Sequence, residues 1–387
     1  MTTRDARVND VRGLWGLDYS RLHVNHGSYG AAPIEVLAEQ SRWRQRMEAG
    51  TTYFMADEVH PAIRAAAAAL AGYVGAAADD LVFVDNATGG INAVLGSLAL
   101  QPGDEIVVHS HIYGAVLKTA RHFAARQGAS IVTAEVPFPQ PTADGIVDAF
   151  RAALSARTRA VIIDHITSPS ALVFPVGELV ALCREAGVLS IVDGAHAPGQ
   201  VPLDLEALGA DIYTGNCHKW LMAPKGVAFL HARPEHQAWL HPTIISHGYE
   251  QGFVAEFDWT GTRDVSAALS VPAAIAFHNR LGGPLLMGAN RQLAWQAAEM
   301  LAERWGTTIP ASADMFAAMV LIGAPFGTDA SEARMLALRT RLRQLGADAP
   351  VTEVDGQLFV RISAQAYNRI EDYEQLADIV LQAARET

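Results

Sequence analysis

The sequence predicts an α/β protein with a mainly parallel, seven-stranded type of sheet in a large domain and a smaller α+β domain at the C-terminus. Short apolar runs alternate with stretches of helical periodicity between about residues 80 and 230. This alternation is typical of βαβ units with right-handed crossovers. Half of the 387 residues are hydrophobic and 18% are charged, so we expect a compact protein with a large buried core.

Three segments are expected along the chain. Residues 1–20 form an N-terminal extension, residues 21–284 the large domain and residues 285–387 the small domain. The pattern becomes helical from about residue 265, and residues 357–363 alternate like a strand before a final helical stretch.

Composition excludes several classes of function. The net charge is −12 without a basic cluster, which argues against a nucleic-acid partner. The uncharged runs are too short to span a bilayer, and the first residues lack the apolar core of a signal peptide. Two cysteines, Cys183 and Cys217, fit a reducing compartment. We therefore expect a cytoplasmic protein with no membrane association, and we expect no metal site.

The first candidate segment, Asn25–Gly30, is rich in turn-forming residues and predicts a loop. Asn25 and His26 are either ordinary turn residues or residues that face a site. A second candidate segment, Asp85–Gly90, follows the apolar run 81–84 and precedes a helical pattern. Free backbone N–H groups at such a helix start, around Thr88 and Gly89, suit a phosphate.

Two further strand ends carry side chains that suit a flat cofactor. Strand 106–109 is followed by His111 and Tyr113, and either ring is placed to stack on an aromatic ligand. Strand 161–164 is followed by Thr167 and Ser168, whose hydroxyls can reach a ligand oxygen.

The central stretch is the apolar run 188–192, which predicts a buried parallel strand that ends at Asp193. A second strand-like segment, 211–214, leads to His218 and Lys219. Ligands of open α/β sheets bind at this edge. Pyridoxal phosphate needs a lysine for a Schiff base and an acid that keeps its ring nitrogen protonated. Lys219 and Asp193 therefore predict a pyridoxal 5′-phosphate enzyme rather than a turn residue and a surface charge.

These motifs resemble the class V aminotransferase family of fold-type I pyridoxal phosphate enzymes, and within it the isopenicillin N epimerase branch. The resemblance covers nearly the whole chain. Its most specific stretches are Val192–Gly199, Gly215–Pro224 and Gly261–Asp264.

The resemblance implies a role for each matched position. Lys219 would form the Schiff base, Asp193 would pair with the ring nitrogen and His196 would approach the phenolic oxygen, while Tyr113 would stack on the ring. Arg361 would bind the substrate carboxylate, near Asn25 and His26. The remaining cofactor contacts would come from Thr88, Gly89, Ser168, Asn216, His218 and, from a neighbouring subunit, Thr262. A homodimer with shared active sites is therefore implied.

The expected activity is chemistry at the Cα of an amino acid. Resemblance favours epimerisation, with β-elimination on a cysteine derivative as the alternative and transamination as a third outcome. Desulfurase relatives carry a nucleophilic cysteine on a loop, and residues 218–387 contain no cysteine, which argues against desulfurase activity. Cys217 is either a buried small hydrophobe or a thiol that tunes the site.

Overall fold

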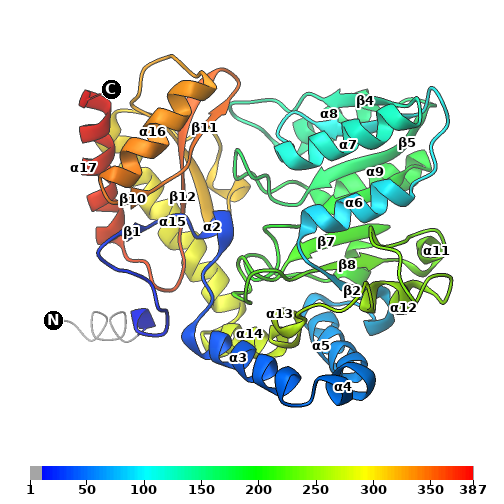
Figure 1. Ribbon diagram of the computed structural model, residues 1–387. Coiled ribbons are helices and arrows are strands. Elements are labelled where there is room, and N and C mark those ends of the chain that lie inside the picture. The colour runs from blue at the N-terminus through cyan, green and yellow to red at the C-terminus, as the bar shows by residue number, and fades with distance from the viewer. Residues whose placement is uncertain (1–10, 387) are drawn as a thin grey trace.

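A computed structural model describes residues 11–386, and its centre is a seven-stranded sheet (Figure 1). The strands lie in the order β2-β8-β7-β6-β5-β3-β4. Their bounds are β2 Leu81–Val84, β3 Glu105–His109, β4 Ser130–Ala134, β5 Thr158–Asp164, β6 Leu189–Asp193, β7 Ile212–Asn216 and β8 Ala228–Ala232. Strands β3 to β7 are parallel, and β8 is antiparallel to both of its neighbours. The predicted mainly parallel sheet is confirmed.

Helices cover both faces of this sheet because successive strand residues point into different cores. Ile162 of β5 belongs to one core, and Val161 and Ile163 belong to the other. The first core includes α6 (Ala87–Ser97), α7 (Gly114–Arg126) and α12 (Phe253–Asp258). The second includes α5 (Val59–Val74), α8 (Ala143–Ala153) and α9 (Val176–Ala186). Burial on both faces explains the continuous apolar runs of the strands.

Further helices complete this part of the chain. They are α3 Ile34–Ala49, α4 Thr51–Tyr53, a π-helix Phe54–Glu58, α10 Leu205–Leu208, α11 Pro234–Gln237, α13 Ser266–Leu269 and α14 Val271–Arg280. The loop predicted at Asn25–Gly30 is instead largely a short helix, α2 (His26–Tyr29). Within residues 11–386, no helix combines the length and the apolar character needed to cross a membrane.

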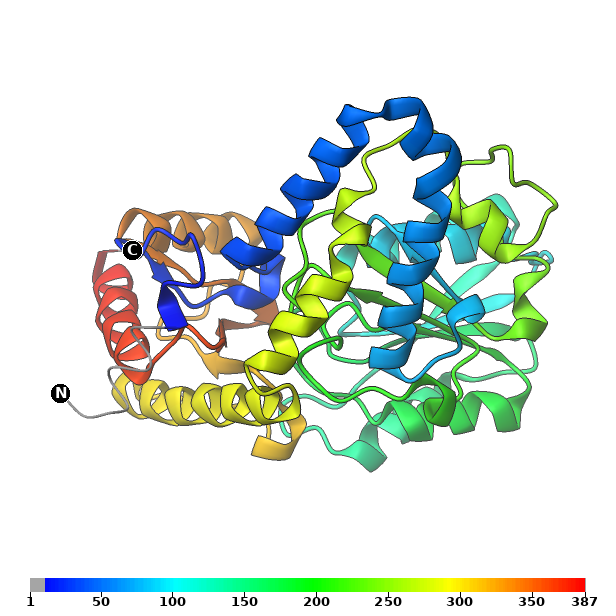
Figure 2. The same ribbon diagram turned by 90° about the horizontal axis from the view of Figure 1, so that it is seen from below.

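The C-terminal elements form a second lobe beside the large sheet (Figure 2). Its antiparallel sheet has the order β11-β12-β9, with bounds β9 Met319–Gly323, β11 Val351–Val354 and β12 Gln357–Ser363. The lobe's helices are α15 Pro284–Trp305, α16 Glu332–Gln344 and α17 Ile370–Glu386. The strand predicted at residues 357–363 is β12.

The N-terminal segment packs on this C-terminal lobe. Strand β1 (Leu22–His23) pairs in parallel with β10 (Ala347–Asp348). The Arg12 guanidinium lies 2.6 Å from the Asp372 carboxylate. Contacts of the segment therefore cross the expected domain borders at residues 20 and 284, and the division into 1–20, 21–284 and 285–387 remains a prediction.

Candidate active site

Four parallel strands end in polar residues at one edge of the large sheet. His109, Asp164, Asp193 and Asn216 are the last residues of β3, β5, β6 and β7. Asp164 and Asp193 are direct register partners. All four side chains are buried. The edge predicted from the apolar run 188–192 therefore carries a cluster of buried polar groups, of which sequence reasoning identified Asp193 and Asn216.

Lys219 lies in the turn after β7, and α2 presses against its backbone. Gly30, at the end of α2, has φ 70° and ψ 168°, a combination that essentially only glycine adopts. A Cβ at Gly30 would lie 2.1 Å from the carbonyl oxygen of His218. The Nε2 atom of His26 is 3.0 Å from the Lys219 carbonyl oxygen, and the Nδ1 atom is 2.9 Å from the Tyr367 hydroxyl. The segment that was predicted to face substrate thus also holds the lysine loop.

The Lys219 amine meets an imidazole whose tautomer is determined by a tryptophan. Nε1 of Trp220 lies 3.3 Å from Nδ1 of His196, and Nζ of Lys219 lies 3.1 Å from Nε2 of the same ring. Indole N–H is a donor only, so Nδ1 accepts and the ring hydrogen sits on Nε2. That N–H can donate to Nζ only if the amine is neutral.

The electrostatic surroundings favour loss of the Lys219 proton. Burial first, and then the charge of Arg361, lowers the pKa of Lys219 to about 8, against opposing effects of Asp193 and Asp164. Burial also keeps the pKa of His196 well below its usual value. A desolvated neutral lysine is a nucleophile towards aldehydes and a general base.

Asp193 and Asp164 cannot both be ionised at low cost. Burial and then the charge of Asp164 raise the pKa of Asp193, and burial also raises the pKa of Asp164. Nε2 of His109 accepts from the backbone N–H of Asp164 at 3.4 Å, and it lies 3.2 Å from the Asp164 Oδ1 atom. The lone pair of His109 Nε2 repels an ionised carboxylate oxygen and attracts a protonated one. We therefore assign the proton that the Asp164 and Asp193 carboxyl groups share to Asp164.

A phosphate cradle lies at the start of α6, where Asn86 caps the helix by accepting from the Gly89 N–H at 2.8 Å. Gly90 permits the helix to approach β7, because a Cβ there would lie 2.5 Å from the Thr214 hydroxyl. Oδ1 of Asn216 accepts from the Ala87 N–H at 2.9 Å, so this side chain orders the helix start. Thr88 is in the first turn. First-turn N–H groups and the helix dipole favour an anion.

The structure also shows where His218, Thr262 and Cys217 lie. His218 is anchored by its Nδ1 atom, 3.1 Å from the Val227 carbonyl oxygen. Thr262 lies in the loop before α13, next to Arg263, which pairs with Asp85 at 3.0 Å. Cys217 is fully buried, and burial raises the pKa of its thiol. A protonated buried thiol fits the small-hydrophobe interpretation of Cys217.

The C-terminal lobe contributes Arg361, on β12, to the site. Arg361 as a residue is 4% exposed, and its guanidinium donates to neutral groups, the Ser168 carbonyl oxygen, Ser28 Oγ at 3.0 Å and Asn25 Oδ1 at 3.4 Å. Among residues 11–386 it forms no ion pair with a carboxylate. A buried cation without an anionic partner is costly, so this fork is arranged for a carboxylate from outside the chain.

A cavity of about 350 Å³ opens above Arg361, with Tyr113 and Ser168 in its wall. Tyr113 caps α7 and is 45% exposed, whereas the alternative ring, His111, is buried against Ser170 at 2.7 Å. Tyr113 is therefore the ring that faces the cavity. Among the described residues, no group of three or more His, Cys, Asp and Glu side chains is placed to hold a metal ion.

The residues present fit pyridoxal phosphate. Lys219 provides an amine whose pKa is lowered to about 8, Asp193 is a buried acid without an ion-pair partner among residues 11–386, and Arg361 is a buried cation that also lacks such a partner. The start of α6 supplies an anion cradle beside them. The structure thus brings together Lys219, Asp193, His196 and Arg361 from both lobes.

Sequence reasoning missed two contributors to this site, Trp220 and Asp164. Trp220 follows Lys219 directly, and Asp164 ends an apolar run just as Asp193 does. The strand-end position was a usable signal for Asp164. Trp220 gave no signal, because its hydrogen bond to His196 spans two separate loops.

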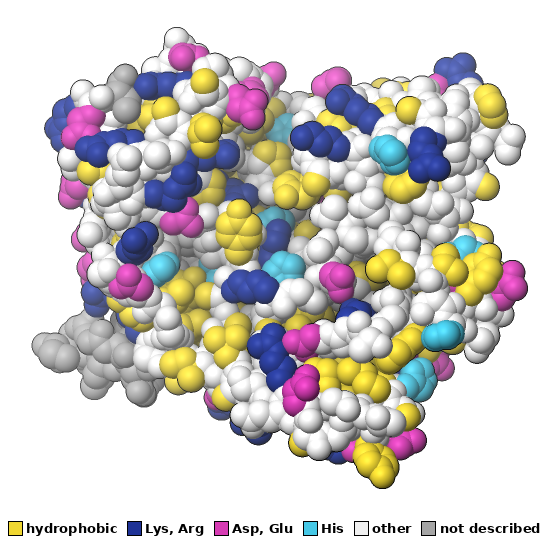
Figure 3. Space-filling model, in the orientation of Figure 1, with side chains coloured by type: hydrophobic (Ala, Val, Ile, Leu, Met, Phe, Trp, Pro, Cys, Tyr) yellow, Lys and Arg dark blue, Asp and Glu magenta, His cyan; other side chains and the backbone are white. Residues whose placement is uncertain are grey.

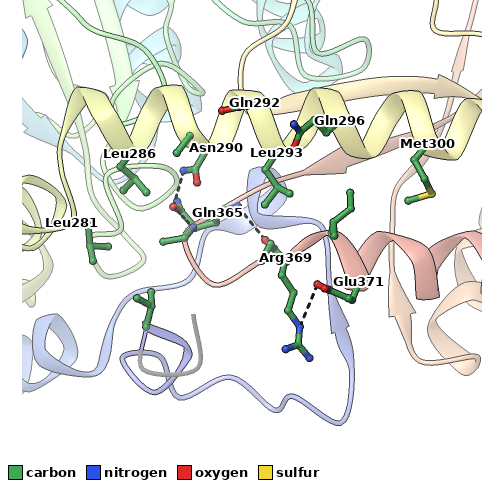
Figure 4. Close-up of a pocket in the computed structure, with 15 residues that line it drawn as sticks. Leu281, Leu286, Asn290, Gln292, Leu293, Gln296, Met300, Gln365, Arg369 and Glu371 are labelled. Carbon is green, nitrogen blue, oxygen red and sulfur yellow. Dashed lines mark hydrogen bonds and ion pairs between the residues drawn. The ribbon is translucent and has the colours of Figure 1, made fainter. Parts of the chain in front are cut away.

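A second and larger cavity, of about 710 Å³, lies away from this chemistry, between α15 and residues 365–371 (Figure 4). Asn290 and Gln365 are bonded across it at 2.9 Å. Its charged residues, Arg369 and Glu371, pair with each other at 3.9 Å. It has neither a lysine nor an unpaired acid in its wall, so it is not the candidate active site.

The chain matches a known protein family and several known proteins in sequence. The family model described as aminotransferase class V matches residues 32–376. A protein of Oryza sativa subsp. japonica named "Putative L-cysteine desulfhydrase 1" is 38% identical, with 92% of this chain and 82% of that protein covered. The isopenicillin N epimerase of Streptomyces clavuligerus is 33% identical, with 96% and 97% covered.

Solved structures share the fold. A mutant of C-DES with glycine covalently linked to its PLP cofactor superimposes with a TM-score of 0.78 at 21% identity, covering 94% of this chain and 96% of that chain. The cysteine desulfurase CsdA of Escherichia coli gives a TM-score of 0.79 at 20% identity, with 98% of each chain covered. At these identities the likeness concerns the fold.

Proposed function

The chain belongs to the aminotransferase class V family and is a pyridoxal-phosphate-dependent enzyme, and from this premise we propose that it is a carbon–sulfur β-lyase acting on cysteine or a cysteine derivative. With cysteine itself, the amino acid and water give pyruvate, ammonia and hydrogen sulfide. The Cα–H and Cβ–S bonds break, and the Cα proton first passes to a base of the enzyme.

Each residue of the site has a separate role in this reaction. Bound pyridoxal phosphate supplies an electron sink for the charge left at Cα. The Arg361 fork binds the substrate carboxylate, and Lys219, as a neutral amine, takes the Cα proton and can deliver it to the leaving sulfur. Asp193 holds a proton on the ring nitrogen, and the N–H at Nε2 of His196 faces the position that Nζ now occupies. Thr88, Gly89, Asn216 and His218 would hold the phosphate.

The observation that carries the proposal is that, among the residues that the structure describes, Lys219 is the base whose pKa and contacts suit proton transfer at Cα. Epimerisation requires a second proton donor on the face opposite Lys219. His26 is unsuited to this role because both of its ring nitrogens are bonded within the protein. The Tyr113 hydroxyl has no hydrogen-bond partner among residues 11–386 that would activate it. β-Elimination needs Lys219 alone.

The relatives give further support. Four plant relatives whose names include L-cysteine desulfhydrase are 33–38% identical to this chain. Epimerisation is the second candidate, because two isopenicillin N epimerases at 33% identity match over 97–98% of their own length, against 82–88% for the plant proteins.

Proton NMR in D₂O with L-cysteine, S-alkylcysteines and other L-amino acids separates the candidates. Pyruvate with released sulfide or thiol is the expected result. Deuterium at Cα together with the D-epimer, and no pyruvate, would replace the lyase by an epimerase. A keto acid that requires an added acceptor would indicate an aminotransferase. The Lys219→Ala variant is the blank, and its loss of the visible cofactor band checks that the cofactor is attached at Lys219.

A further inference from the structure

The cavity above Arg361 carries more positive charge than one substrate carboxylate requires. Three arginines, Arg339, Arg343 and Arg361, line it together with one carboxylate, Asp348. The excess stands out because the whole chain has a net charge of −12. Figure 3 shows the face between the two lobes hollowed, with Lys, Arg and His side chains in and beside the hollow.

The three cations lie at different depths. Arg361 is buried, Arg339 is partly buried and Arg343 is exposed. Arg339 and Arg343 are four residues apart on α16, so they share one face of the helix. Arg339 is anchored through its Nε atom, 2.7 Å from the Val351 carbonyl oxygen. One wall of the cavity therefore carries charge from the base of the pocket to its rim.

These arginines are not neutralised within the chain. Among residues 11–386 none of the three forms an ion pair with a carboxylate, and Asp348 is bonded to Asn25 at 3.0 Å. The arginines also act on one another: burial and then the charge of Arg339 lower the pKa of Arg361, and burial and then Arg343 lower that of Arg339. Mutual repulsion in a cavity is relieved by an anionic ligand.

We propose that the substrate carries a second anionic group, at the end of its side chain, which Arg339 and Arg343 bind while Arg361 holds the α-carboxylate. The inference rests on the proposed lyase function for the substrate type, an S-substituted cysteine whose substituent ends in a carboxylate or another acid. A volume of about 350 Å³ falls at the lower end of small-molecule sites and leaves room beyond the cysteine part. Cleavage would release pyruvate, ammonia and an acid-bearing thiol.

The test compares three substrates of similar length: S-(2-carboxyethyl)-L-cysteine, neutral S-propyl-L-cysteine and cationic S-(2-aminoethyl)-L-cysteine. The expected kcat/KM is about tenfold higher for the carboxyethyl compound than for the propyl compound, and lowest for the aminoethyl compound. The Arg343→Gln variant should remove this preference and keep turnover of the propyl compound. Arg341→Gln is the matched control, since Arg341 lies on the same helix but pairs with Glu386, and it should keep the preference.

Binding to the apoprotein provides a measurement that does not depend on turnover. Calorimetry should show 3,3′-thiodipropanoate, a dianion, binding about tenfold more tightly at low salt than 3-(propylthio)propanoate, with the difference lost in Arg343→Gln. Equal affinity or equal kcat/KM for charged and neutral compounds would overturn the second anion site while leaving the lyase intact. Absence of pyruvate from every compound would refute the lyase, and the apoprotein affinities would then still decide the anion site.

Discussion

The indole N–H of Trp220 lies 3.3 Å from Nδ1 of His196, and through this contact a tryptophan determines which nitrogen faces the lysine. Nε2 of His196 is left as the donor towards Nζ of Lys219, 3.1 Å away. The protonation of the amine thus depends on a hydrogen bond made at the far side of the imidazole ring that it contacts.

The first prediction concerns the pH dependence of cofactor uptake. Neutral amine is the form that attacks an aldehyde, and burial lowers the pKa of Lys219 to about 8. As pH rises, the amine loses its proton near this value, so the rate at which apoprotein takes up pyridoxal phosphate should rise through about pH 8. Stopped-flow absorbance of the growing visible band measures this rate. A midpoint near the ordinary lysine value would contradict the assignment.

The Trp220→Phe substitution should move that midpoint upwards. Without the indole donor, His196 can place its hydrogen on Nδ1 and accept at Nε2 from a protonated lysine. The loss of a hydrogen bond of about 1 kcal/mol corresponds to a rise of up to about 0.7 pKa units in Lys219. Trp43→Phe is the control, because the Trp43 indole N–H has no hydrogen-bond partner among the described residues. An unchanged midpoint in Trp220→Phe would show that the tautomer is set elsewhere.

Substitutions of the two carboxyls should have unequal effects. Asp193→Asn removes the charge that holds a proton on the cofactor nitrogen, and kcat should fall on the order of 100-fold or more. Asp164→Asn replaces a protonated acid by a neutral amide of the same shape, so kcat should change less than about fivefold. Steady-state kinetics on the cofactor-saturated variants distinguishes them. Equal losses would mean that Asp164 also carries charge.

Gly30→Ala should disturb both stability and cofactor uptake. The new Cβ has to occupy a backbone conformation that costs about 1–3 kcal/mol in other residues, and it would meet the His218 carbonyl oxygen at 2.1 Å. Gly226→Ala is the matched control, since Gly226 has φ 87° and nothing within 4 Å of its Cβ position. Thermal unfolding should report a loss in both variants, larger in Gly30→Ala. Slower uptake of pyridoxal phosphate is expected in Gly30→Ala alone, and normal uptake there would mean that the contact does not position the lysine.

Hybrid subunits test whether Thr262 acts in a neighbouring subunit, as a homodimer with shared sites requires. Thr262→Glu should weaken cofactor binding by repelling the phosphate, and Lys219→Ala should be inactive. In a mixed dimer of these two variants, one site has both an intact lysine and an intact Thr262 from its partner. Co-expression should therefore restore activity, and sedimentation should give the mass of a dimer. A monomer, or mixtures that stay inactive, would remove the shared-site proposal.

Much of the fold follows from local pattern. The apolar runs within β3, β5 and β6 follow from burial of these strands on both faces, and this property is visible in sequence. Asp193 was identifiable because it ends such a run, and Lys219 because it follows the next strand. The α2 segment was predicted as a loop; its short helix depends on packing against the lysine turn and on Gly30, which no local pattern reveals.

By itself the sequence determined the mainly parallel sheet, the Lys219–Asp193 pair and the cofactor that suits it, since each depends on residue type and on spacing along one element. Tertiary structure alone decided the charge states and the shape of the substrate cavity. The Trp220–His196–Lys219 chain, the Asp164–Asp193 pair and the wall of Arg339, Arg343 and Arg361 each join segments that are distant in sequence or on separate elements. Proton positions and repulsion depend on distance and burial, and these exist only once the chain has folded.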